Sequence, residues 1–240
     1  HCGETATSVD YAQWMFYFNF QSDNCLQPVF EPEPQTISGS ELLAHSLSST
    51  SAGSDFKLLL LGQPVPEEYQ PYYNGWSRAE TPAASGVTIH HPQGDVKMIS
   101  TYTQPLISSA YNTTIDDPNG NYWRVYWSET ENGHGVTEGG SSGSPLFDND
   151  GLVVGSLTGG ASSCTFVDSP DYYGKFNYSW NTGSTDSTKI LSYWLDPDQT
   201  GVMSLKGTDL DTTTVSAWFN ANKTSIVVGE SVLFENTSFG

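Results

Sequence analysis

The stretch that decides the fold is Gly-Gly-Ser-Ser-Gly-Ser-Pro-Leu at residues 139–146. Its glycines flank a pair of serines and permit the tight backbone that exposes a serine hydroxyl. In that geometry the backbone amides of Gly140 and Ser142 converge on one point, where they can stabilise a developing oxyanion. A Gly/Ser-rich flexible loop without chemistry is the alternative. The chain re-enters an apolar strand at residues 145–147, which favours a structured turn with Ser142 as the nucleophile.

A serine hydroxyl needs a neighbouring base to become a strong nucleophile, and the base needs a carboxylate to orient it. Asp55 immediately precedes the apolar stretch 56–61, where its side chain can be buried and hydrogen-bonded. The alternative for Asp55 is a turn residue that only begins a strand. The candidate bases are the five histidines His1, His45, His90, His91 and His134.

Two of these histidines, His90 and His91, are neighbours in the sequence and suggest a metal pair. Adjacent strand residues point to opposite faces of a sheet, so the two rings cannot easily share one ion. We therefore expect a structural role for the pair and no metal site. His134 is expected to be a solvated loop residue, and His45 belongs to no motif.

Short strand-like stretches, separated by Gly, Pro, Asn and Asp clusters, dominate the chain and predict an all-β fold. They are residues 11–20, 56–61, 87–91, 96–101, 122–127 and 152–157. The run at 58–61 is expected to lie in a buried strand. Asn149-Asp150-Gly151 predicts a tight hairpin turn rather than a calcium loop, because the spaced carboxylates of such a loop are absent.

One helix is expected near the end of this β region, at residues 187–195. Apolar side chains recur there at helical spacing and mark a packing face. Thr185 or Ser187 is its expected cap, and Asp196-Pro197 its end. After Gly207 the character changes: residues 208–214 are polar like a linker, and two short strands within 215–240 suggest the start of an immunoglobulin-like unit.

The chain is strongly acidic, with 8 Lys and Arg against 27 Asp and Glu, a net charge of −19 and a pI near 4.2. A chain this acidic is repelled by a phosphate backbone, so we expect no nucleic-acid partner and no anionic membrane partner. The acidity can attract basic substrates, but its simpler role is to keep the protein soluble. No apolar run approaches the ~20 residues that cross a bilayer.

The three cysteines are Cys2, Cys25 and Cys164, and none has the paired spacing of a zinc site. An odd count leaves at least one without a partner in this chain. An oxidising, extracellular history with missing partner cysteines fits better than a metal, so we expect a secreted protein without cofactors. The chain begins at His1 without an initiator methionine, which we interpret as a processed product or a fragment.

The order His, Asp, Ser, with the histidine followed by Cys-Gly, resembles the chymotrypsin-like serine proteases of trypsin fold. The resemblance sharpens toward the lysyl endopeptidase branch of bacterial secreted proteases and covers about residues 1–207. The shared segments are Tyr-Phe-Asn-Phe at 17–20 leading to Cys25, Ser-Asp-Phe at 54–56, Ile-His-His-Pro at 89–92, Gly-Val-Thr-Glu at 135–138, Gly-Ser-Ser-Gly-Ser-Pro at 140–145, Gly-Gly-Ala-Ser-Ser-Cys at 159–164, Asp-Tyr-Tyr-Gly at 171–174 and Trp-Leu-Asp-Pro at 194–197.

This resemblance implies a Ser-His-Asp triad with His1 as general base, Asp55 as its orienting carboxylate and Ser142 as nucleophile. It implies that the amides of Gly140 and Ser142 form the oxyanion hole. The fold it implies is two six-stranded antiparallel β-barrels, the first incomplete at its N-terminus, with a C-terminal helix. The three cysteines would pair with cysteines nearer the N-terminus. We expect the intact protein to be active and this fragment to be inactive.

The resemblance also implies where substrate side chains bind. Val136 stands where trypsin carries its selecting aspartate and cannot pair with a cation. The lysyl endopeptidase branch uses a later aspartate, matched here by Asp171, with Thr158 and Gly159 beside the substrate. Thr158 stands where that branch has a histidine, and Tyr111 stands for its partner tryptophan. We expect cleavage after lysine, with arginine as the weaker expectation; for Asp171 alone, a turn residue is the alternative.

Residues 217–240 resemble the opening of a PKD-type immunoglobulin-like repeat, of the kind that accompanies secreted bacterial hydrolases. The expected partners are protein or peptide substrates, and the expected state is a monomer. A non-catalytic adhesion module on a protease-like fold is the alternative function, since folds outlive activities. An esterase of the Gly-x-Ser-x-Gly type is a third, weaker hypothesis, because that fold alternates strands with helices.

Overall fold

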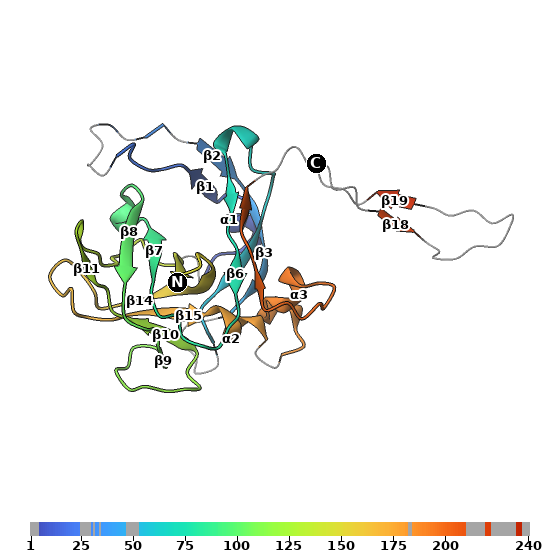
Figure 1. Cartoon of the computed structure of the whole chain (residues 1–240). Helices are drawn as coiled ribbons and strands as arrows, with labels where there is room; N and C mark the ends of the chain where they lie inside the picture. Colours follow the sequence, from blue (N-terminus) through green and yellow to red (C-terminus); the bar gives the residue numbers. More distant parts are fainter. Residues whose placement is uncertain are drawn as a thin grey trace, which may run out of the picture.

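The computed structural model describes residues 5–24, 30, 32–33, 35–46, 53–181, 184–209, 219–221 and 234–236, the last two segments by their backbone alone. Short strands dominate these residues (Figure 1). In chain order the elements are α1 (Ser8–Tyr11), β1 (Met15–Phe18), β2 (Gln35–Ser38), β3 (Ser40–His45), β4 (Lys57–Leu61), the 3-10 turn η1 (Glu67–Tyr69), β5 (Tyr72–Tyr73), β6 (Trp76–Ser77), β7 (Gly86–His90), η2 (Pro92–Gly94), β8 (Met98–Tyr102), β9 (Ile107–Ser109), β10 (Tyr122–Val125), β11 (Glu129–Thr130), β12 (Gly133–His134), β13 (Pro145–Asp148), β14 (Val153–Gly160), β15 (Asp171–Lys175), α2 (Phe176–Trp180), η3 (Ser187–Lys189), α3 (Ser192–Leu195), β16 (Ser204–Leu205), β17 (Thr208–Asp209), β18 (Phe219–Ala221) and β19 (Phe234–Asn236).

The largest sheet runs in the order β8-β7-β13-β14-β15-β10-β9, and every pair along it is antiparallel. Its core cluster is apolar and aromatic, with Tyr102, Trp123, Leu146 and Tyr173 almost without exposed surface. Burying each such side chain contributes roughly 1.5–3 kcal/mol relative to leaving it exposed. The chain from β7 to β15 is therefore a well-packed β unit, and it carries Ser142 and Asp171.

Two further strand pairs form the N-terminal part, β1 with β2 and β3 with β4. In Figure 1 the β1–β2 pair lies above β7 and β8. A second core cluster joins this part to the C-terminal helices, because Ala44 and Phe56 pack with Trp76, Trp180 and Leu191. The all-β, trypsin-like fold class expected from the sequence is confirmed. In the described residues β8 and β9 are the two edges of the large sheet, and no pairing joins them.

Most predicted strands are confirmed within a few residues, and so is the hairpin turn between β13 and β14. Two details were wrong. Tyr11 does not begin a strand, because residues Ser8–Tyr11 form a helical turn that Thr7 caps, with Asp10 completing a capping box. The strand β4 is only half-buried, and Leu60 keeps 55% of its surface exposed.

The predicted single helix at residues 187–195 was also wrong. The structure has η3, capped by Asp186, and then a separate α3. Ile190 separates them, because its φ of −134° and ψ of 144° are extended and its side chain is buried. Burial of this β-branched residue outweighs the helical spacing of its neighbours. A short helix that the spacing did not predict, α2, directly follows β15.

The C-terminal region is described only in part. Thr208–Asp209 pairs with β5, and β18 pairs with β19 in an antiparallel two-stranded sheet. The other residues predicted to form the linker and the immunoglobulin-like unit lie outside the described residues. Cys164 is exposed and makes no disulfide within the described part of the chain, whereas Cys2 and Cys25 lie outside it. None of the described helices is long and apolar enough to cross a membrane.

Candidate active site

Ser142 lies in two consecutive tight turns between β12 and β13, in the segment 139–144, called the serine loop below. The Ser141 amide donates to the Glu138 carbonyl at 3.0 Å, and the Ser144 amide donates to the Ser141 carbonyl at 3.0 Å. Gly140 and Gly143 have φ of +95° and +85° in these turns. Only glycine adopts such angles at no steric cost, so the sequence Gly-Ser-Ser-Gly specifies this backbone.

The backbone amides of this loop divide into two sets. Those of Ser141, Gly143 and Ser144 donate to carbonyl groups of the protein. Those of Gly139, Gly140 and Ser142 donate to no residue in the part of the chain that the structure describes. The amides of Gly140 and Ser142 are therefore available to an external acceptor beside the Ser142 side chain, as the predicted oxyanion hole requires.

Gly140 is also required by the space around it. A Cβ there would lie 3.1 Å from the His91 carbonyl oxygen and 3.1 Å from the Gln93 amide nitrogen. The Gln93 amide donates to the Gly139 carbonyl at 2.6 Å, which ties the two loops together. The segment after β7 therefore supports the serine loop from one side.

A buried hydrogen-bond chain supports the loop from beneath. Ser100 donates to the Val136 carbonyl at 2.8 Å and is 3.2 Å from Nε2 of His90. Nδ1 of His90 lies 2.8 Å from the Ser141 hydroxyl. Because the Ser100 hydroxyl proton points to Val136, the arrangement assigns Nε2 as donor and leaves Nδ1 to accept from Ser141.

Burial and these hydrogen bonds keep the His90 ring neutral. His90 is 2% exposed, and burial lowers its pKa to about 4, with the His91 charge acting in the same direction and Asp171 and Glu138 opposing. The structural role predicted for His90 now has a definite form, as a support for the serine loop. Ser141 is 1% exposed, whereas Ser142 is half-buried and borders a cleft, so Ser142 is the accessible serine of the pair.

Strand β14 connects the Asp55 segment to the serine loop. It has a φ of +51°, and its backbone carbonyl accepts from the Ser156 hydroxyl at 3.3 Å. The next residue, Leu157, exchanges backbone hydrogen bonds with Gly143 and Ser144 at 2.8 and 2.9 Å. Consecutive residues of one strand thus hold the aspartate segment and the serine loop, which the sequence separates by more than eighty positions.

The aspartate segment is anchored at its base. Asn121 donates to the Gly53 carbonyl, and the Ser54 and Ser179 hydroxyls are 2.5 Å apart. Gly174 packs so closely against the Ser54 carbonyl that a Cβ would not fit. Asp55 is therefore held between β4 and β15 in a fixed position.

The predicted base, His1, lies outside the described residues. The remaining histidines have other neighbours: His45 faces Lys189 at 3.3 Å, and the rings of His91 and His134 hydrogen-bond to the carbonyls of Asp95 and Gly135. No group of His, Cys, Asp and Glu side chains that could hold a metal occurs among the described residues.

Asp171, the predicted pocket aspartate, has no exposed surface. Its Oδ2 accepts from Trp127 Nε1 at 2.7 Å, from Thr137 Oγ1 at 2.7 Å and from Ser162 Oγ at 2.5 Å. Its Oδ1 accepts from the Ser162 amide at 3.3 Å. All four donors are neutral, so these contacts stabilise a carboxylate without compensating its charge. Trp127 and Thr137 were not predicted to take part.

Thr158 and Gly159 continue β14 beyond the serine loop. Thr158 is buried beside Tyr122, and Gly159 has a φ of +151° at a bulge in the pairing with β15. The Tyr111 hydroxyl lies 3.5 Å from the position of a Cβ on Gly159. Burial raises the pKa of Tyr111, and the Asp55 charge adds to the rise.

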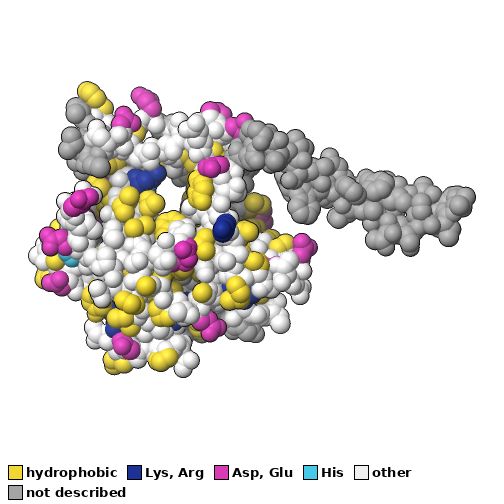
Figure 2. All heavy atoms as spheres, viewed as in Figure 1, with side chains coloured by type: hydrophobic (Ala, Val, Ile, Leu, Met, Phe, Trp, Pro, Cys, Tyr) yellow, Lys and Arg dark blue, Asp and Glu magenta, His cyan; other side chains and the backbone are white. Residues whose placement is uncertain are grey.

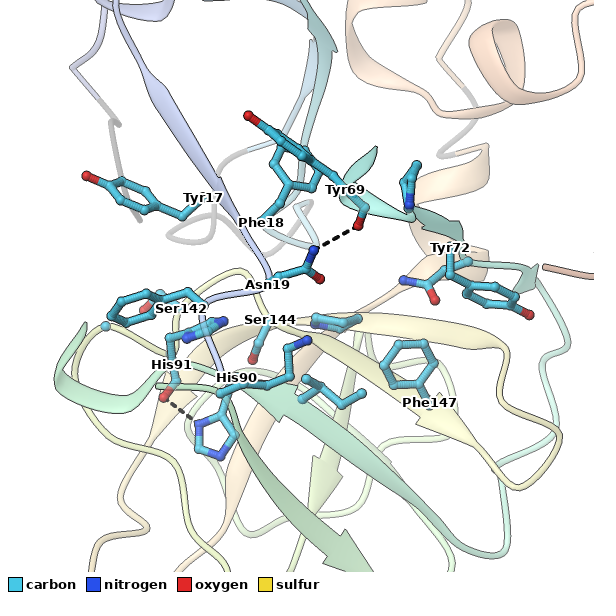
Figure 3. Close-up of a pocket in the computed structure, with 18 of the residues that line it drawn as sticks. Tyr17, Phe18, Asn19, Tyr69, Tyr72, His90, His91, Ser142, Ser144 and Phe147 are labelled. Carbon is cyan, nitrogen blue, oxygen red and sulfur yellow. Dashed lines mark hydrogen bonds between the residues drawn. The ribbon is translucent and has the colours of Figure 1, made fainter. Parts of the chain in front are cut away.

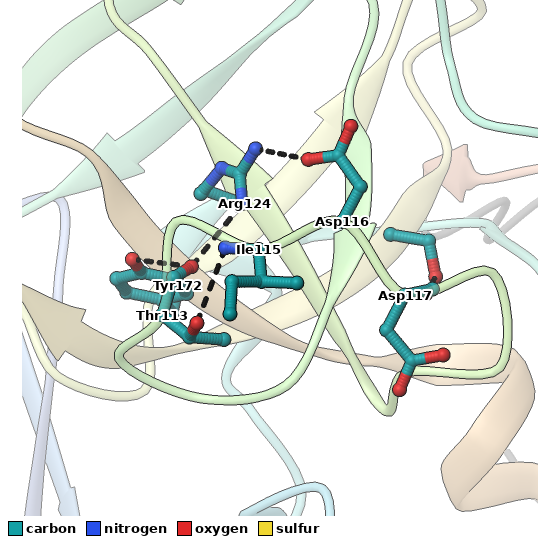
Figure 4. Close-up of polar contacts among 7 residues, drawn as sticks. Thr113, Ile115, Asp116, Asp117, Arg124 and Tyr172 are labelled. Atoms are coloured by element: carbon teal, nitrogen blue, oxygen red, sulfur yellow. Dashed lines mark hydrogen bonds and ion pairs between the residues drawn. The ribbon is translucent and has the colours of Figure 1, made fainter.

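The Tyr111 ring packs on its neighbours, with centroids 5.3 Å from Tyr122 and 5.7 Å from Tyr172. Figure 4 shows the residues that follow in the sequence, from Thr113 to Asp117. The Thr113 carbonyl accepts from Arg124 at 3.1 Å and from the Tyr172 hydroxyl at 3.0 Å, and Asp116 pairs with Arg124 at 2.5 Å. Arg124 is buried, so its contacts with Thr113 and Asp116 anchor this loop to the protein interior.

Ser142 also borders a cleft that Asp171 and Tyr111 do not line. Its lining includes Gly140, Ser142 and Ser144 of the serine loop, together with residues of β1 and the segment around η1 (Figure 3). The space-filling view in Figure 2 shows apolar side chains gathered around a hollow in this face, with acidic side chains scattered over the rest. No sequence motif predicted this cleft, because its walls come from four distant segments.

Two solved structures of a protease named Rv3671c, both in an inactive form, resemble the chain. The first, a serine-to-alanine mutant from M. tuberculosis H37Rv, is 16% identical with a TM-score of 0.36, over 59% of this chain and 60% of that one. The second is 18% identical with a TM-score of 0.35, over 58% and 64%. The chain thus spans less than two thirds of either protein. A family model described as the C-terminal domain of lysyl endopeptidase matches residues 1–174. The chain belongs to the lysyl endopeptidase family.

Proposed function

We propose that this chain is the catalytic part of a serine endopeptidase that hydrolyses peptide bonds through Ser142, Asp55 and His1. The observation that carries the proposal is the pair of open amides on Gly140 and Ser142, next to an accessible serine hydroxyl. Membership of the lysyl endopeptidase family supports the same reaction class. Each oxyanion donor contributes roughly a factor of 10²–10³ in kcat in this kind of site.

In the proposed reaction His1 takes the proton of the Ser142 hydroxyl, whose oxygen attacks the carbonyl carbon of the scissile bond. The carbonyl oxygen gains negative charge and accepts from the two amides. His1 then gives its proton to the leaving nitrogen as the C–N bond breaks, and an acyl-Ser142 ester remains. Water, deprotonated by His1, hydrolyses this ester and restores the serine.

We further propose cleavage after lysine, with arginine second, because Asp171 carries a negative charge that its neutral neighbours do not balance. A lysine ammonium that reaches this carboxylate would supply the missing charge, and an unpaired buried charge is costly. Profiling the full-length protein on a peptide library tests the preference. Cuts clustered after glutamate or phenylalanine would reject it.

Labelling with a fluorophosphonate tests the reaction itself. The expected result is one covalent adduct on Ser142 in the full-length protein and none in Ser142→Ala. An accessible but unreactive Ser142, together with absent peptide hydrolysis, would instead favour a non-catalytic adhesion module. Hydrolysis of esters without any hydrolysis of peptides would favour an esterase.

We also propose that the protein is exported as a monomer and that residues 215–240 begin a PKD-type repeat after a linker at 208–214. Cys164 is exposed and has no disulfide partner among the described residues, so it supports an oxidising compartment only in combination with partner cysteines elsewhere. Mass spectrometry of the unreduced full-length protein tests this. Disulfides that join Cys2, Cys25 and Cys164 to other cysteines are expected, and three free thiols would contradict export to an oxidising medium.

A further inference from the structure

The cleft beside Ser142 has the size of a ligand site. Its volume is about 580 Å³, within the roughly 300–1,000 Å³ of small-molecule and cofactor sites. The serine loop, β7 and the start of β13 form one side, and the end of β1 with residues 69–74 forms the other. None of Asp171, Thr158, Gly159 and Tyr111 lines it. The cleft is therefore distinct from the predicted lysine pocket, although both are predicted to serve Ser142.

In the described part of the chain, six aromatic residues line the cleft beside its polar ones. They are Tyr17, Phe18, Phe20, Tyr69, Tyr72 and Phe147. Tyr17 and Tyr72 are each 56% exposed, so much of their ring surface still faces water. Figure 3 shows Tyr17, Phe18 and Tyr69 on one wall, with Ser142, Ser144 and His91 opposite. Aromatic rings that remain exposed at a cleft gain most from an apolar or aromatic partner.

The aromatic wall, residues 17–20 with 69–72, is a fixed structure. Asn19 has a φ of +53°, and its side-chain amide donates to the Tyr69 carbonyl at 2.8 Å and to Gln35 Oε1 at 2.6 Å. The rings of Phe18 and Tyr69 pack with centroids 5.6 Å apart. These contacts join the two segments of the wall, which lie fifty residues apart in the sequence.

The wall is also tied to the serine loop. The Lys97 amide donates to the Phe20 carbonyl at 3.0 Å, and the Phe20 ring lies 6.0 Å from the His91 ring. The same His91 segment holds Gly139 and Gly140 through Gln93. The distance from the wall to Ser142 is thereby set by one continuous chain of contacts.

The charge of the cleft differs from that of the molecule. The chain carries a net charge of −19, yet among the described residues no Asp or Glu lines the cleft, and Lys97 contributes a positive charge. The described lining thus offers no carboxylate to a basic ligand. Its recognition chemistry is apolar and aromatic.

We propose that this cleft binds the substrate segment that follows the scissile bond and selects a large aromatic side chain within its first three residues. The inference rests on the proposed function, because a polypeptide that crosses Ser142 extends to both sides of it. If the residue before the bond points to Asp171, the leaving segment has the aromatic cleft as its path. The cleft then adds a second specificity to the lysine preference.

The test uses the full-length protein and peptides that share one sequence through lysine and differ after it. The leaving segment is either Ala-Ala-Ala or the same with one tyrosine at each position in turn. At one position or more, tyrosine is expected to raise kcat/KM about tenfold. This factor corresponds to the free energy gained when much of one aromatic ring is buried. Tyr17→Ala and Tyr72→Ala should reduce this advantage to about twofold. Tyr193→Ala, which removes a tyrosine with 58% exposure elsewhere, should leave it unchanged.

Two controls separate this inference from the proposed function. A methyl ester of the same lysyl peptide has no leaving segment, so Tyr17→Ala and Tyr72→Ala should hydrolyse it like the unchanged protein. Binding of free Ala-Tyr-Ala and Ala-Ala-Ala amides to the Ser142→Ala protein, measured by calorimetry, needs no catalysis. Tighter binding of the tyrosine peptide that the cleft variants abolish supports the inference even if turnover is absent. Equal binding, or equal kcat/KM for all leaving segments, overturns it.

Discussion

The surroundings of Asp171 and the cleft beside Ser142 differ in burial and in charge. At β15 a fully buried carboxylate, Asp171, is held by four neutral donors. Exposed rings such as Tyr17 and Tyr72 instead line the open cleft. An enclosed charge discriminates steeply, because leaving it unpaired is costly, whereas apolar surface discriminates in proportion to the area it covers. Selection should therefore be steep before the scissile bond and graded after it.

The largest effect should come from breaking the charged side. Asp171→Asn keeps the shape and removes the charge, so kcat/KM on a lysyl peptide is expected to fall about a thousandfold, as for loss of one partner of a buried charge pair. Steady-state kinetics on matched peptides with lysine or alanine before the bond measures it. The alanine peptide should change less than about threefold.

Asp171→Asn can also disturb folding, because the new amide group faces the Trp127 N–H. The melting temperature of the variant controls for this. An equal loss on both peptides would show a general disturbance of the site. Full retention of lysine preference would exclude Asp171 as the cation's partner, and the contrast between the two sides would disappear.

The next effect concerns the structure that both sides share. In Gly140→Ala the new Cβ meets the His91 carbonyl at 3.1 Å, at a φ of +95°. The loop must shift, and misplacement by ~1 Å costs about 100-fold in rate. We expect kcat to fall about 100-fold on peptides and on the ester alike, with KM nearly unchanged.

Gly151→Ala is the matched control for this variant. Its φ is +75°, and nothing lies within 4 Å of the added Cβ. It carries the same backbone strain in the hairpin turn, far from the amides of Gly140 and Ser142. A similar kcat loss in both variants would assign the effect to stability rather than to the oxyanion amides.

A third prediction concerns the buried support of the loop. The pKa of His90 is lowered from 6.5 to about 4 in the folded protein. The unfolded chain therefore binds more protons between these pH values, so stability is full above pH 6.5 and falls as the pH drops toward 4. The loss is about 3 kcal/mol. Denaturant unfolding at several pH values measures it.

His90→Asn cannot titrate in this range and serves as the comparison. Between pH 6.5 and pH 4 its free energy of unfolding should fall by about 3 kcal/mol less than that of the unchanged protein. NMR titration of the His90 ring gives an independent reading. A ring pKa near 6.5 in the folded state would contradict the buried, neutral arrangement with Ser141 and Ser100.

Local chemistry made the serine loop predictable from sequence. Glycines at 140 and 143 specify positive φ angles, and the apolar residues that follow specify a strand. The all-β class followed in the same way from short strand-like stretches separated by turn-forming residues. The helical spacing of apolar residues at 187–195 predicted one helix. The structure has two separate turns there, because Ile190 is buried in an extended conformation.

The parts that sequence reasoning missed are assembled from distant segments. The support by His90 of Ser141 joins residues 51 positions apart, and the cleft combines β1, η1, β7 and the serine loop. No local pattern encodes such contacts. The four donors around Asp171 show the same limit, since Trp127 and Thr137 lie 44 and 34 positions from it.

The smallest effect should come from the loop that covers Gly159. Asp116 pairs with Arg124 but is 71% exposed, so solvent screens the pair and its contribution is at most about 1 kcal/mol. Asp116→Asn should loosen the Tyr111 loop and raise KM on lysyl peptides about twofold without changing kcat, since Tyr111 contacts neither the serine loop nor Asp171 in the interactions described. The advantage of tyrosine in the leaving segment should stay the same, because neither Tyr111 nor Asp116 lines the cleft. Asp150→Asn, on the exposed hairpin turn, is the matched control. A change in the leaving-segment preference would mean that the two sides are coupled, and the division drawn between them would fail.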